Sequence, residues 1–425
     1  MTTFRAFRHA NYRRFWYGML VSLVGTWMQG TAQSFLVYEM TGSALRTGMV
    51  MFAFTLPSLL FSLFGGAIAD RYDRRRLLVG TQIAFMTSAA VLATLTLTGV
   101  VQVWHILVLA FANGVTMAVD APARQAMLPT LVGREDLQNA VALNAAVFNG
   151  SRIFGPALAG IVYKIGGPGW CFAVNAISYL AVIWPLVRMR LVMASGDAPS
   201  EPMTAQIRDG LAYVRSHAAV RSLLLLLAGV GTFGFAWMVL APAFTVRVLG
   251  MGPVENGYLL TATGVGATAG ALTVATLQGL RRPGVFVVTC ATLAGGMLVA
   301  FSFTRALPVA LLALGVVGFF LTAFMSSTNS TIQSLVEDRY RGRVMSLYTL
   351  ALIGSGPVGS LLAGSVADAL GVPTSLAING ALVVVCAALT YLLAPAVVGL
   401  RVVIPPHPVS LPSSIGTTAG RAAAR

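Results

Sequence analysis

The stretch Gly66-Ala67-Ile68-Ala69-Asp70-Arg71-Tyr72-Asp73-Arg74-Arg75-Arg76 decides how this chain folds. It separates two long apolar runs, one ending near Gly65 and the other beginning at Leu77. A short, highly charged loop between two apolar segments predicts two helices joined by a tight turn. Gly66 and Asp70 are one helical turn apart, so we expect the first helix to end with a smooth contact and a carboxylate on one face.

The composition excludes an ordinary soluble domain. Of the 425 residues, 57% are hydrophobic and only 10% are charged, whereas about 25% of residues are charged in soluble domains. The 44 glycines suit membrane helices that approach one another through small side chains. We therefore expect a polytopic membrane protein surrounded by the lipid bilayer.

Several other function classes are not supported. The net charge of +15 does not indicate a nucleic-acid partner, because the basic residues fall in short patches between apolar segments. Cys171, Cys290 and Cys386 lie within apolar runs without metal-ligand spacing, so we expect core packing, no metal and no cofactor. The chain contains neither a nucleotide-binding loop nor an evident nucleophile–base pair, so we do not expect an enzyme.

Twelve apolar stretches are long enough to cross the membrane as helices, for which about 20 residues are needed. Their approximate limits are 15–39, 46–69, 77–99, 103–127, 137–164, 168–190, 222–249, 256–279, 284–303, 308–333, 343–369 and 373–397. The longest polar interruption, 191–221, divides six spans from six. The predicted fold is therefore all-α, with twelve transmembrane helices in two six-helix bundles.

This division predicts five segments. They are an amino-terminal segment (1–14), a first bundle (15–190), a linker (191–221), a second bundle (222–397) and a tail (398–425). Within the linker, 206–221 has apolar residues at helical spacing opposite arginines, which favours an amphipathic helix at the membrane interface. The tail is rich in Pro, Ser, Gly and Ala, a composition typical of disorder.

The distribution of arginine predicts the orientation. If both termini lie on one side, that side collects nearly all the basic loops, and the other keeps only Arg46, Lys164, Arg247 and Arg305. Basic loops stay in the cytoplasm, so we expect both termini to be cytoplasmic. Abundant Arg and Ala with a single Lys suggest a bacterium with a GC-rich genome, and hence an inner-membrane location.

An internal repeat supports the division into halves. Shifting the chain by 204 residues places Gly150, Ser151, Gly155 and Gly160 on identical residues within 347–379, without a gap. Recurring glycines are hard to ascribe to shared hydrophobicity alone. Because each half has an even number of predicted spans, the two copies share one membrane topology.

The opening stretch resembles the signature loop between the second and third spans of the major facilitator superfamily, Gly-x-x-x-Asp-Arg-x-Gly-Arg-Arg/Lys. It departs from that pattern at Asp73, where Gly is usual. The resemblance implies a cytoplasmic gate that is closed while the transporter faces outward, formed by Gly66, Asp70, Arg71, Arg74 and Arg75.

The same resemblance implies the partners of this gate. Asp70 is expected at the amino terminus of the eleventh span, near Gly342 and Arg343, where the helix dipole favours an anion. Arg74 is expected to meet Asp120 in the fourth span. In the second half Val274 stands where Asp70 would fall, so the gate is one-sided. The alternative is that the arginines only fix topology.

A second motif, Gly150-Ser151-Arg152-Ile153-Phe154-Gly155-Pro156-Ala157-Leu158-Ala159-Gly160, lies in the predicted fifth span. Its small residues form ridges that permit close helix crossing, and Pro156 is expected to bend the helix. It resembles the Gly-Pro antiporter motif found in exporters of the superfamily. Importers also pack helices through small residues, but the two motifs together favour export. The residues that carry the motif are Gly150, Arg152, Gly155, Pro156 and Gly160.

Three charges inside predicted spans are candidates for substrate or proton binding. Arg152 lies about 22 Å along the fifth span, where a charge is costly unless it is paired or hydrated. We expect it to bind an anionic substrate or to pair with Glu39, the alternative being a packing role. Glu39 and Asp120 are candidate proton sites. The alternatives are contact with water for Glu39, and pairing with Arg124 or Arg74 for Asp120.

By the same resemblance, the first, fourth, seventh and tenth spans line a central cavity. Their polar and aromatic residues include Gln33, Asn113, Trp237 and Asn329. Apolar walls with sparse hydrogen-bonding groups suit a small amphiphilic ligand. For each of these residues, packing or lipid contact is the alternative.

The run Pro122-Ala123-Arg124-Gln125-Ala126-Met127-Leu128-Pro129, with Arg152 before Gly155-Pro156, resembles the branch that contains enterobactin exporters and macrolide-efflux-like proteins. The sequence analysis therefore predicts a monomeric secondary active transporter that exports a small molecule in exchange for protons. An importer of a small metabolite and a non-transporting membrane sensor or partner protein are the alternatives.

Overall fold

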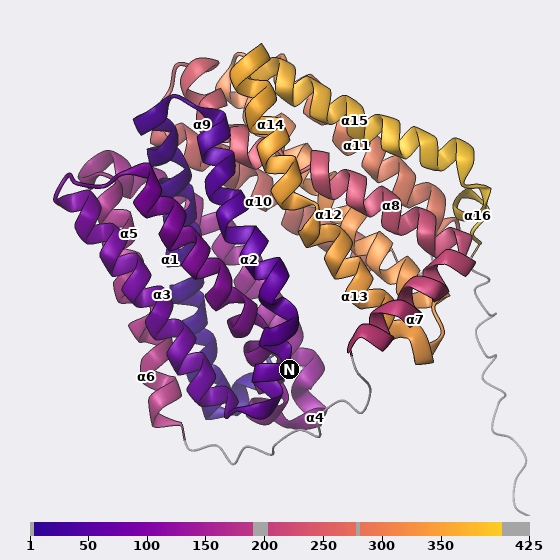
Figure 1. Ribbon diagram of the computed structural model, residues 1–425, viewed down its shortest axis with the longest axis horizontal. Coiled ribbons are helices and arrows are strands. Elements are labelled where there is room, and N and C mark those ends of the chain that lie inside the picture. The colour runs from indigo at the N-terminus through magenta and orange to yellow at the C-terminus, as the bar shows by residue number, and fades with distance from the viewer. Residues whose placement is uncertain (1–3, 190–202, 278–280, 402–425) are drawn as a thin grey trace, which may run out of the picture.

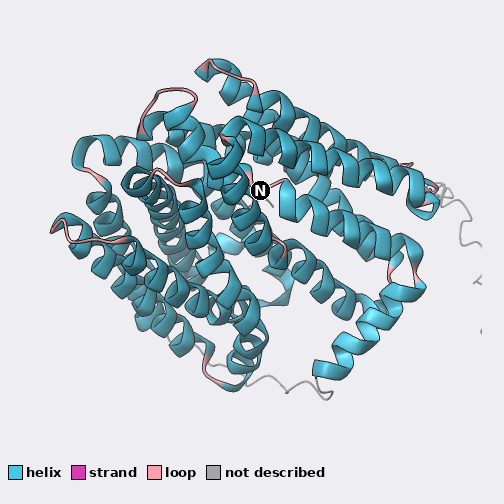
Figure 2. Ribbon diagram, turned by 45° about the horizontal axis from the view of Figure 1, so that its top comes forward, coloured by secondary structure: helices cyan, strands magenta, loops and turns pink. Residues whose placement is uncertain are grey.

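The computed structural model describes residues 4–189, 203–277 and 281–401, and helices are the regular structure throughout these ranges (Figures 1 and 2). Most of the predicted tail and residues 190–202 of the linker region lie outside the described residues.

The amino-terminal half is the indigo-to-magenta group of Figure 1. Its helices pack mainly on one another, with α4 in contact with α1, α2 and α3. The helices that follow the two tight turns begin with capping side chains, because Ser43 accepts a hydrogen bond from the Arg46 N–H and Asp73 accepts one from the Arg76 N–H. The elements are η1 (Arg5–Arg8), α1 (Ala10–Thr41), α2 (Ala44–Arg71), α3 (Arg74–Leu97), α4 (Val103–Gly166), α5 (Pro168–Ser178) and α6 (Leu180–Arg188).

The carboxy-terminal half contains a second set of packed helices, in which α11 contacts α12 and α15. A large hydrophobic cluster that includes Trp237, Phe244, Phe301 and Phe324 forms its core. The elements are α7 (Met203–Ser216), α8 (Ala218–Phe233), α9 (Trp237–Arg247), α10 (Pro253–Thr276), α11 (Pro283–Ser302), α12 (Leu307–Leu335), α13 (Asp338–Gly354), α14 (Gly356–Leu370), α15 (Val372–Leu393) and α16 (Pro395–Val398).

Within the described residues, each predicted span falls mainly on one helix or on a pair of consecutive helices. Among the described residues, ten helical segments have the length and composition to cross a membrane. One of them is α4, whose 64 residues would extend about 96 Å as a straight helix. Gly133 interrupts it at φ 72° and ψ 174°, between the predicted fourth and fifth spans. The first predicted span lies in α1, outside these ten, and the count of twelve stays a prediction.

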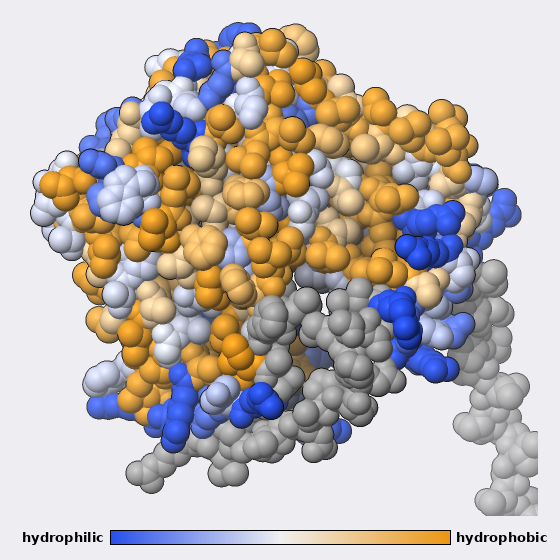
Figure 3. Space-filling model, viewed as in Figure 1, coloured by the Kyte–Doolittle hydropathy of each residue, from blue (hydrophilic) through white to orange (hydrophobic). Residues whose placement is uncertain are grey.

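The outer surface is that of a membrane protein. Figure 3 shows apolar residues over most of the visible face, with hydrophilic residues gathered toward its edges. Large apolar side chains are exposed on both halves, including Trp184, Leu225 and Leu312. A surface of this kind is stable in hydrocarbon and would associate in water.

We name the two ends of the helices by their residues. The basic end is where α2 meets α3, at Arg71–Arg76. The far end is where α1 meets α2, at Thr41–Ser43. The two halves contact each other through α4 and α10 and through α2 and α14. In Figure 1 they approach at the far end, near α9 and α14, and diverge toward the basic end.

Candidate transport pathway and its gates

The signature loop is the tight turn that the sequence predicts. Only Tyr72 and Asp73 separate α2 from α3, and Asp73 accepts the Arg76 N–H at 3.0 Å. The residue that departs from the superfamily pattern therefore caps α3. The close contact expected at Gly66 is instead made by its neighbour, since a Cβ on Gly65 would lie 1.9 Å from the Ala118 carbonyl oxygen. Asp70 lies in the last turn of α2, and its side chain is outside the described part of the structure.

Two arginines of the loop bind backbone carbonyls within their own half. Arg74 donates to the Ala126 carbonyl at 3.2 Å, and Arg75 donates to the carbonyls of Leu186 and Val187 at the end of α6. Arg71 is exposed. The expected contact of Arg74 with Asp120 is thus wrong for this conformation, because a backbone carbonyl takes the guanidinium.

Asp120 is enclosed within the amino-terminal half and is fully buried. Its carboxylate accepts from Thr81 Oγ1 at 2.7 Å and from Gln82 Nε2 at 2.8 Å, and pairs with Arg124 one turn further along α4. A buried carboxylate with three partners is held in place, because losing one would leave a charge uncompensated. This geometry matches the structural alternative for Asp120.

At the basic end of the other half, α7 covers the start of α13. Asp209 Oδ2 accepts from Arg343 Nη1 at 3.1 Å, and the rings of Tyr213 and Tyr340 stack with centroids 4.7 Å apart. The helix expected over 206–221 overlaps α7, which ends at Ser216 and docks on α13. In this conformation Asp209 binds the arginine that the sequence analysis places next to Asp70.

The antiporter-like motif lies where α4 meets both α1 and α10. A Cβ on Gly155 would lie 2.4 Å from Trp27 Cβ, and one on Gly160 would lie 2.7 Å from the Val254 Cα. In return, Gly257 of α10 packs on the Pro156 carbonyl. Gly150 has open space beside it. The motif thus joins the two halves, while α4 remains helical through Pro156.

The repeat reproduces these contacts in the second half. Gly359 and Gly364 are the repeat equivalents of Gly155 and Gly160. A Cβ on Gly359 would lie 1.9 Å from the Thr232 carbonyl oxygen, and one on Gly364 would lie 2.6 Å from the Leu45 Cα. Each half therefore sends one glycine-bearing helix to the first turn of a helix in the other half.

Arg152 and Glu39 are not partners, which corrects one of the two expectations for Arg152. The Arg152 guanidinium lies 6.0 Å from the centroid of the Trp27 ring, and among the described residues it forms no ion pair. Glu39 instead accepts a hydrogen bond from the Tyr163 hydroxyl. The backbone carbonyl of Ile153 accepts a hydrogen bond from Thr261 of α10 at 2.9 Å. We call the contacts of α4 with α10 and of α2 with α14 the seam between the halves, and Arg152 lies at this seam.

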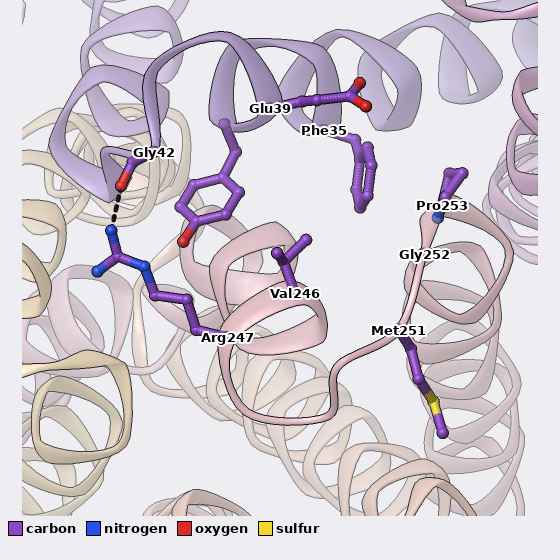
Figure 4. Close-up of a pocket in the computed structure, with 9 residues that line it drawn as sticks. Phe35, Glu39, Gly42, Val246, Arg247, Met251, Gly252 and Pro253 are labelled. Atoms are coloured by element: carbon purple, nitrogen blue, oxygen red, sulfur yellow. Dashed lines mark hydrogen bonds between the residues drawn. The ribbon is translucent and has the colours of Figure 1, made fainter.

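A pocket of about 430 Å³ opens between α1 and the α9–α10 turn at the far end (Figure 4). Glu39 and Phe35 line it from one half, and Arg247 and Met251 from the other. Arg247 donates to the Gly42 carbonyl, and its guanidinium lies 5.8 Å from the Tyr38 ring centroid. This end of the pathway is therefore bridged by a cross-half hydrogen bond.

A second cavity, of about 270 Å³, lies between α2 and five helices of the carboxy-terminal half. Met51, Met238 and Met325 contribute to its wall, and hydroxyl groups come from Thr55, Thr232 and Ser360. Methionine adapts its shape to different apolar surfaces. The cavity therefore suits a small molecule with a large apolar surface and few polar groups.

The predicted cavity residues do not converge on this space. Trp237 is 1% exposed and belongs to the core of the carboxy-terminal half, which makes its expected place on the cavity wall wrong. Asn329 accepts from Gln333 at 2.6 Å on α12. Gln33 and Asn113 are half-buried on α1 and α4.

Two acidic residues that the sequence analysis did not single out each contact three donor groups. At the far end, Asp368 of α14 accepts from Ser43 Oγ at 2.5 Å and from the backbone N–H groups of Ala44 at 2.8 Å and Leu45 at 3.2 Å. The second residue is Asp136. Asp368 follows Gly364 by one turn, but the repeat places Lys164 at the equivalent position of the first half, so the repeat gave no signal for this acid.

Asp136 lies between the predicted fourth and fifth spans and holds the amino-terminal segment. It is 1% exposed, with His9 Nε2 at 2.9 Å, Arg8 Nη2 at 2.7 Å and Arg5 Nε at 3.5 Å. The hydrogen bond from His9, followed by that from Arg8 and the nearby arginine charges, lowers the pKa of Asp136 despite its burial.

This arrangement of helices defines a membrane transporter of the major facilitator fold. Among solved structures, a bacterial homologue of the human lysosomal transporter Spinster has a TM-score of 0.71 at 14% identity, covering 91% of this chain and 98% of that one. A D-xylose-proton symporter has a TM-score of 0.70 at 13% identity, covering 93% and 100%. Similarity at this level establishes the fold alone.

The sequence comparisons establish the family. The family model described as Transmembrane secretion effector, from the major facilitator superfamily, matches residues 1–402. The chain therefore belongs to this family. It is 30% identical to the multidrug efflux pump Tap of Mycolicibacterium fortuitum over 84% of this chain and 88% of the relative. It is 27% identical to the staphyloferrin A transporter of Staphylococcus aureus (84% and 89%) and 25% identical to the enterobactin exporter EntS of Citrobacter koseri (88% and 89%).

The sequence-based assignment to an efflux branch of the superfamily is thereby confirmed. The family and the apolar helices make the chain a multi-pass membrane transporter.

Proposed function

We propose that the protein exports a small amphiphilic molecule across the bacterial inner membrane by alternating access, in exchange for protons. The observation that carries this proposal is the methionine-lined cavity between the halves, in a chain whose family includes efflux pumps. An apolar cavity with a few hydroxyl groups favours amphiphilic ligands over sugars, which need many hydrogen bonds. The two halves are the moving bodies, and one chain suffices for the cycle.

In this proposal the basic end is cytoplasmic, as the arginine bias predicts. The cross-half contacts at Gly42, Ser43 and Gly364 close the far end. The conformation is then inward-facing, ready to take substrate from the cytoplasm. The Asp70 gate would form in the opposite state, when Arg343 leaves Asp209 and the start of α13 approaches α2.

Glu39 is the proposed proton site. It is exposed in the far-end pocket, where protons could arrive from outside, and the Tyr163 hydroxyl orients its carboxylate. Asp120 is less suited, because three partners enclose its carboxylate. Arg152 lies at the seam between the halves without an ion-pair partner among the described residues, so it remains the proposed contact for an anionic group of the substrate.

The test is accumulation of a siderophore, a macrolide and a fluorescent amphiphile in cells that lack or carry the protein. We expect the wild type to lower accumulation, and an uncoupler that dissipates the proton gradient to abolish the effect. Proton-driven accumulation inside the cells would instead establish an importer. Purified protein that moves no protons with any member of a broader panel would favour a sensor.

Asp70→Asn tests the gate. We expect a several-fold lower maximal rate with nearly unchanged apparent affinity, because a gate contact changes the populations of states and leaves the pocket intact. The matched control is Glu135→Gln at the same end, since Glu135 is exposed and lies away from the start of α13, between the predicted fourth and fifth spans. A pure loss of affinity at normal turnover would reject the gating role.

A further inference from the structure

The cross-half contact at Asp368 has the chemistry of a gate. A carboxylate from α14 accepts three hydrogen bonds from the first turn of α2, in the other half. Free N–H groups and the helix dipole at this position favour an anion, and hydrogen bonds to a charged acceptor are the stronger kind. The contact links residues 325 positions apart in the chain, so it exists only while the halves are closed at this end.

The residues around this contact belong to the junction between α14 and α2. Gly364, one turn before Asp368, lets α14 lie directly on Ala44 and Leu45. One further turn back, Ser360 is buried and donates to the Gly48 carbonyl at 3.3 Å. Asp368 itself is exposed and therefore supports no hydrophobic core. Separating α14 from α2 would break these contacts together and open the far end.

We infer that Asp368 is the gate residue of the far end, and that its carboxylate on the α2 amino terminus stabilises the state that is open at the basic end. This inference rests on the proposed alternating-access function. It also gives the signature loop a counterpart, because Asp70 is expected to place a carboxylate from α2 on the amino terminus of α13. The two gates then use the same chemistry, with the acid supplied by opposite halves.

The experiment measures how open the far end is. Ser360→Cys serves as the reporter, in a chain whose Cys171, Cys290 and Cys386 are replaced by alanine. A membrane-impermeant maleimide is applied to intact cells, and labelling is normalised to the chain present in the membrane. We expect Asp368→Asn to raise the labelling rate roughly five- to tenfold, since an anion at a helix terminus and its charge-assisted bonds are lost.

Two controls separate gating from general loosening. Glu255→Gln removes a carboxylate at the same end that caps its own helix, where Glu255 accepts from the Gly252 N–H at 3.0 Å. We expect no change in labelling. Ser43→Ala should raise labelling, and adding it to Asp368→Asn should raise it little further, because both remove one contact.

A population shift can also be reversed. Asp70→Asn weakens the opposite gate, so its combination with Asp368→Asn should return labelling toward that of the wild type, which a purely structural role of Asp368 would not produce. If Asp368→Asn is labelled at the wild-type rate, or if Glu255→Gln raises the labelling rate by the same factor, the inference is overturned. If the wild type exports nothing while Asp368→Asn labels faster, the proposed function fails and the gate stands.

Discussion

The two crossings that join the halves at the far end share a backbone arrangement and differ in charge. In one, Gly160 of α4 lies on Val254 of α10. In the other, Gly364 of α14 lies on Leu45 of α2. The 204-residue repeat makes these glycines equivalent, so the same close approach is built twice.

One turn beyond each glycine the crossings diverge. The repeat places Lys164 at the position of Asp368. The N-cap of α10 is Gly252, where α2 has Ser43. The pair that holds α14 on α2 therefore corresponds to a lysine and a glycine at the other crossing, where Lys164 offers the α10 amino terminus no carboxylate. Instead, α10 is capped by its own Glu255. The duplicated glycines let the two halves pack closely at both crossings, and Asp368 adds a charged contact at only one of them.

The largest effect should come from filling the seam itself. Gly160→Ala and Gly364→Ala each place a Cβ within 2.7 Å of backbone atoms in the other half, and overpacking of this kind costs about 1–3 kcal/mol. We expect either change to lower export roughly tenfold or more. Export from cells, normalised to protein in the membrane, is the measurement.

Gly150→Ala is the matched control, because a Cβ at Gly150 meets nothing within 4 Å. Normal export by this variant would place the effect at the seam. If only one of the two seam glycines proved sensitive, the crossings would differ in packing as well as in charge.

A smaller effect is expected at Arg247, which bridges the same end from α9. Its guanidinium donates to the Gly42 carbonyl and lies beside the Tyr38 ring, but exposed contacts of this kind contribute about 0–1 kcal/mol. Arg247→Ala should therefore raise far-end labelling about two- to threefold. The Ser360→Cys reporter measures this labelling rate. An increase above that of Asp368→Asn would mean that Arg247 on α9, and not Asp368 on α14, makes the main contact that closes the far end.

Much of the fold followed from the sequence because membrane helices are long, apolar and separated by charged turns. In the described part of the chain every predicted span falls mainly on helix, and the turn after Arg71 is as short as the charge density predicts. The docking of α7 on α13 was harder to predict from the sequence. Asp209 contacts Arg343, 134 residues away, and an amphipathic pattern alone did not distinguish a docked helix from one lying at the membrane interface.

The contacts of the candidate site were also harder to predict, because many of them join residues that are far apart in the chain. The repeat identified Gly155 and Gly160, since small residues in register leave a visible pattern. Asp368 produced no such pattern in the sequence, because a lone acid at the end of an apolar run is equally typical of a residue that contacts water. Arg74 and Asp120 were assigned to each other by resemblance, whereas each is satisfied by a nearer group, the Ala126 carbonyl and Arg124.

The smallest effect on gating is expected from Asp136, an acid that binds within one half. Its pKa is lowered in the folded protein, so its contribution to stability is present above the ordinary pKa of about 3.9. That contribution is lost as the pH falls through the lowered value. Asp136→Asn should therefore lower the Tm near pH 6, and the difference from the wild type should shrink below about pH 4.

The same variant should leave far-end labelling unchanged, because its partners Arg5, Arg8 and His9 all belong to the same half as Asp136. Thermal unfolding of the purified protein across pH gives the first readout, and Ser360→Cys labelling gives the second. A labelling change as large as that of Asp368→Asn would mean that the amino-terminal segment is coupled to the far end. The contrast between acids that join the halves and acids that hold one half together would then fail.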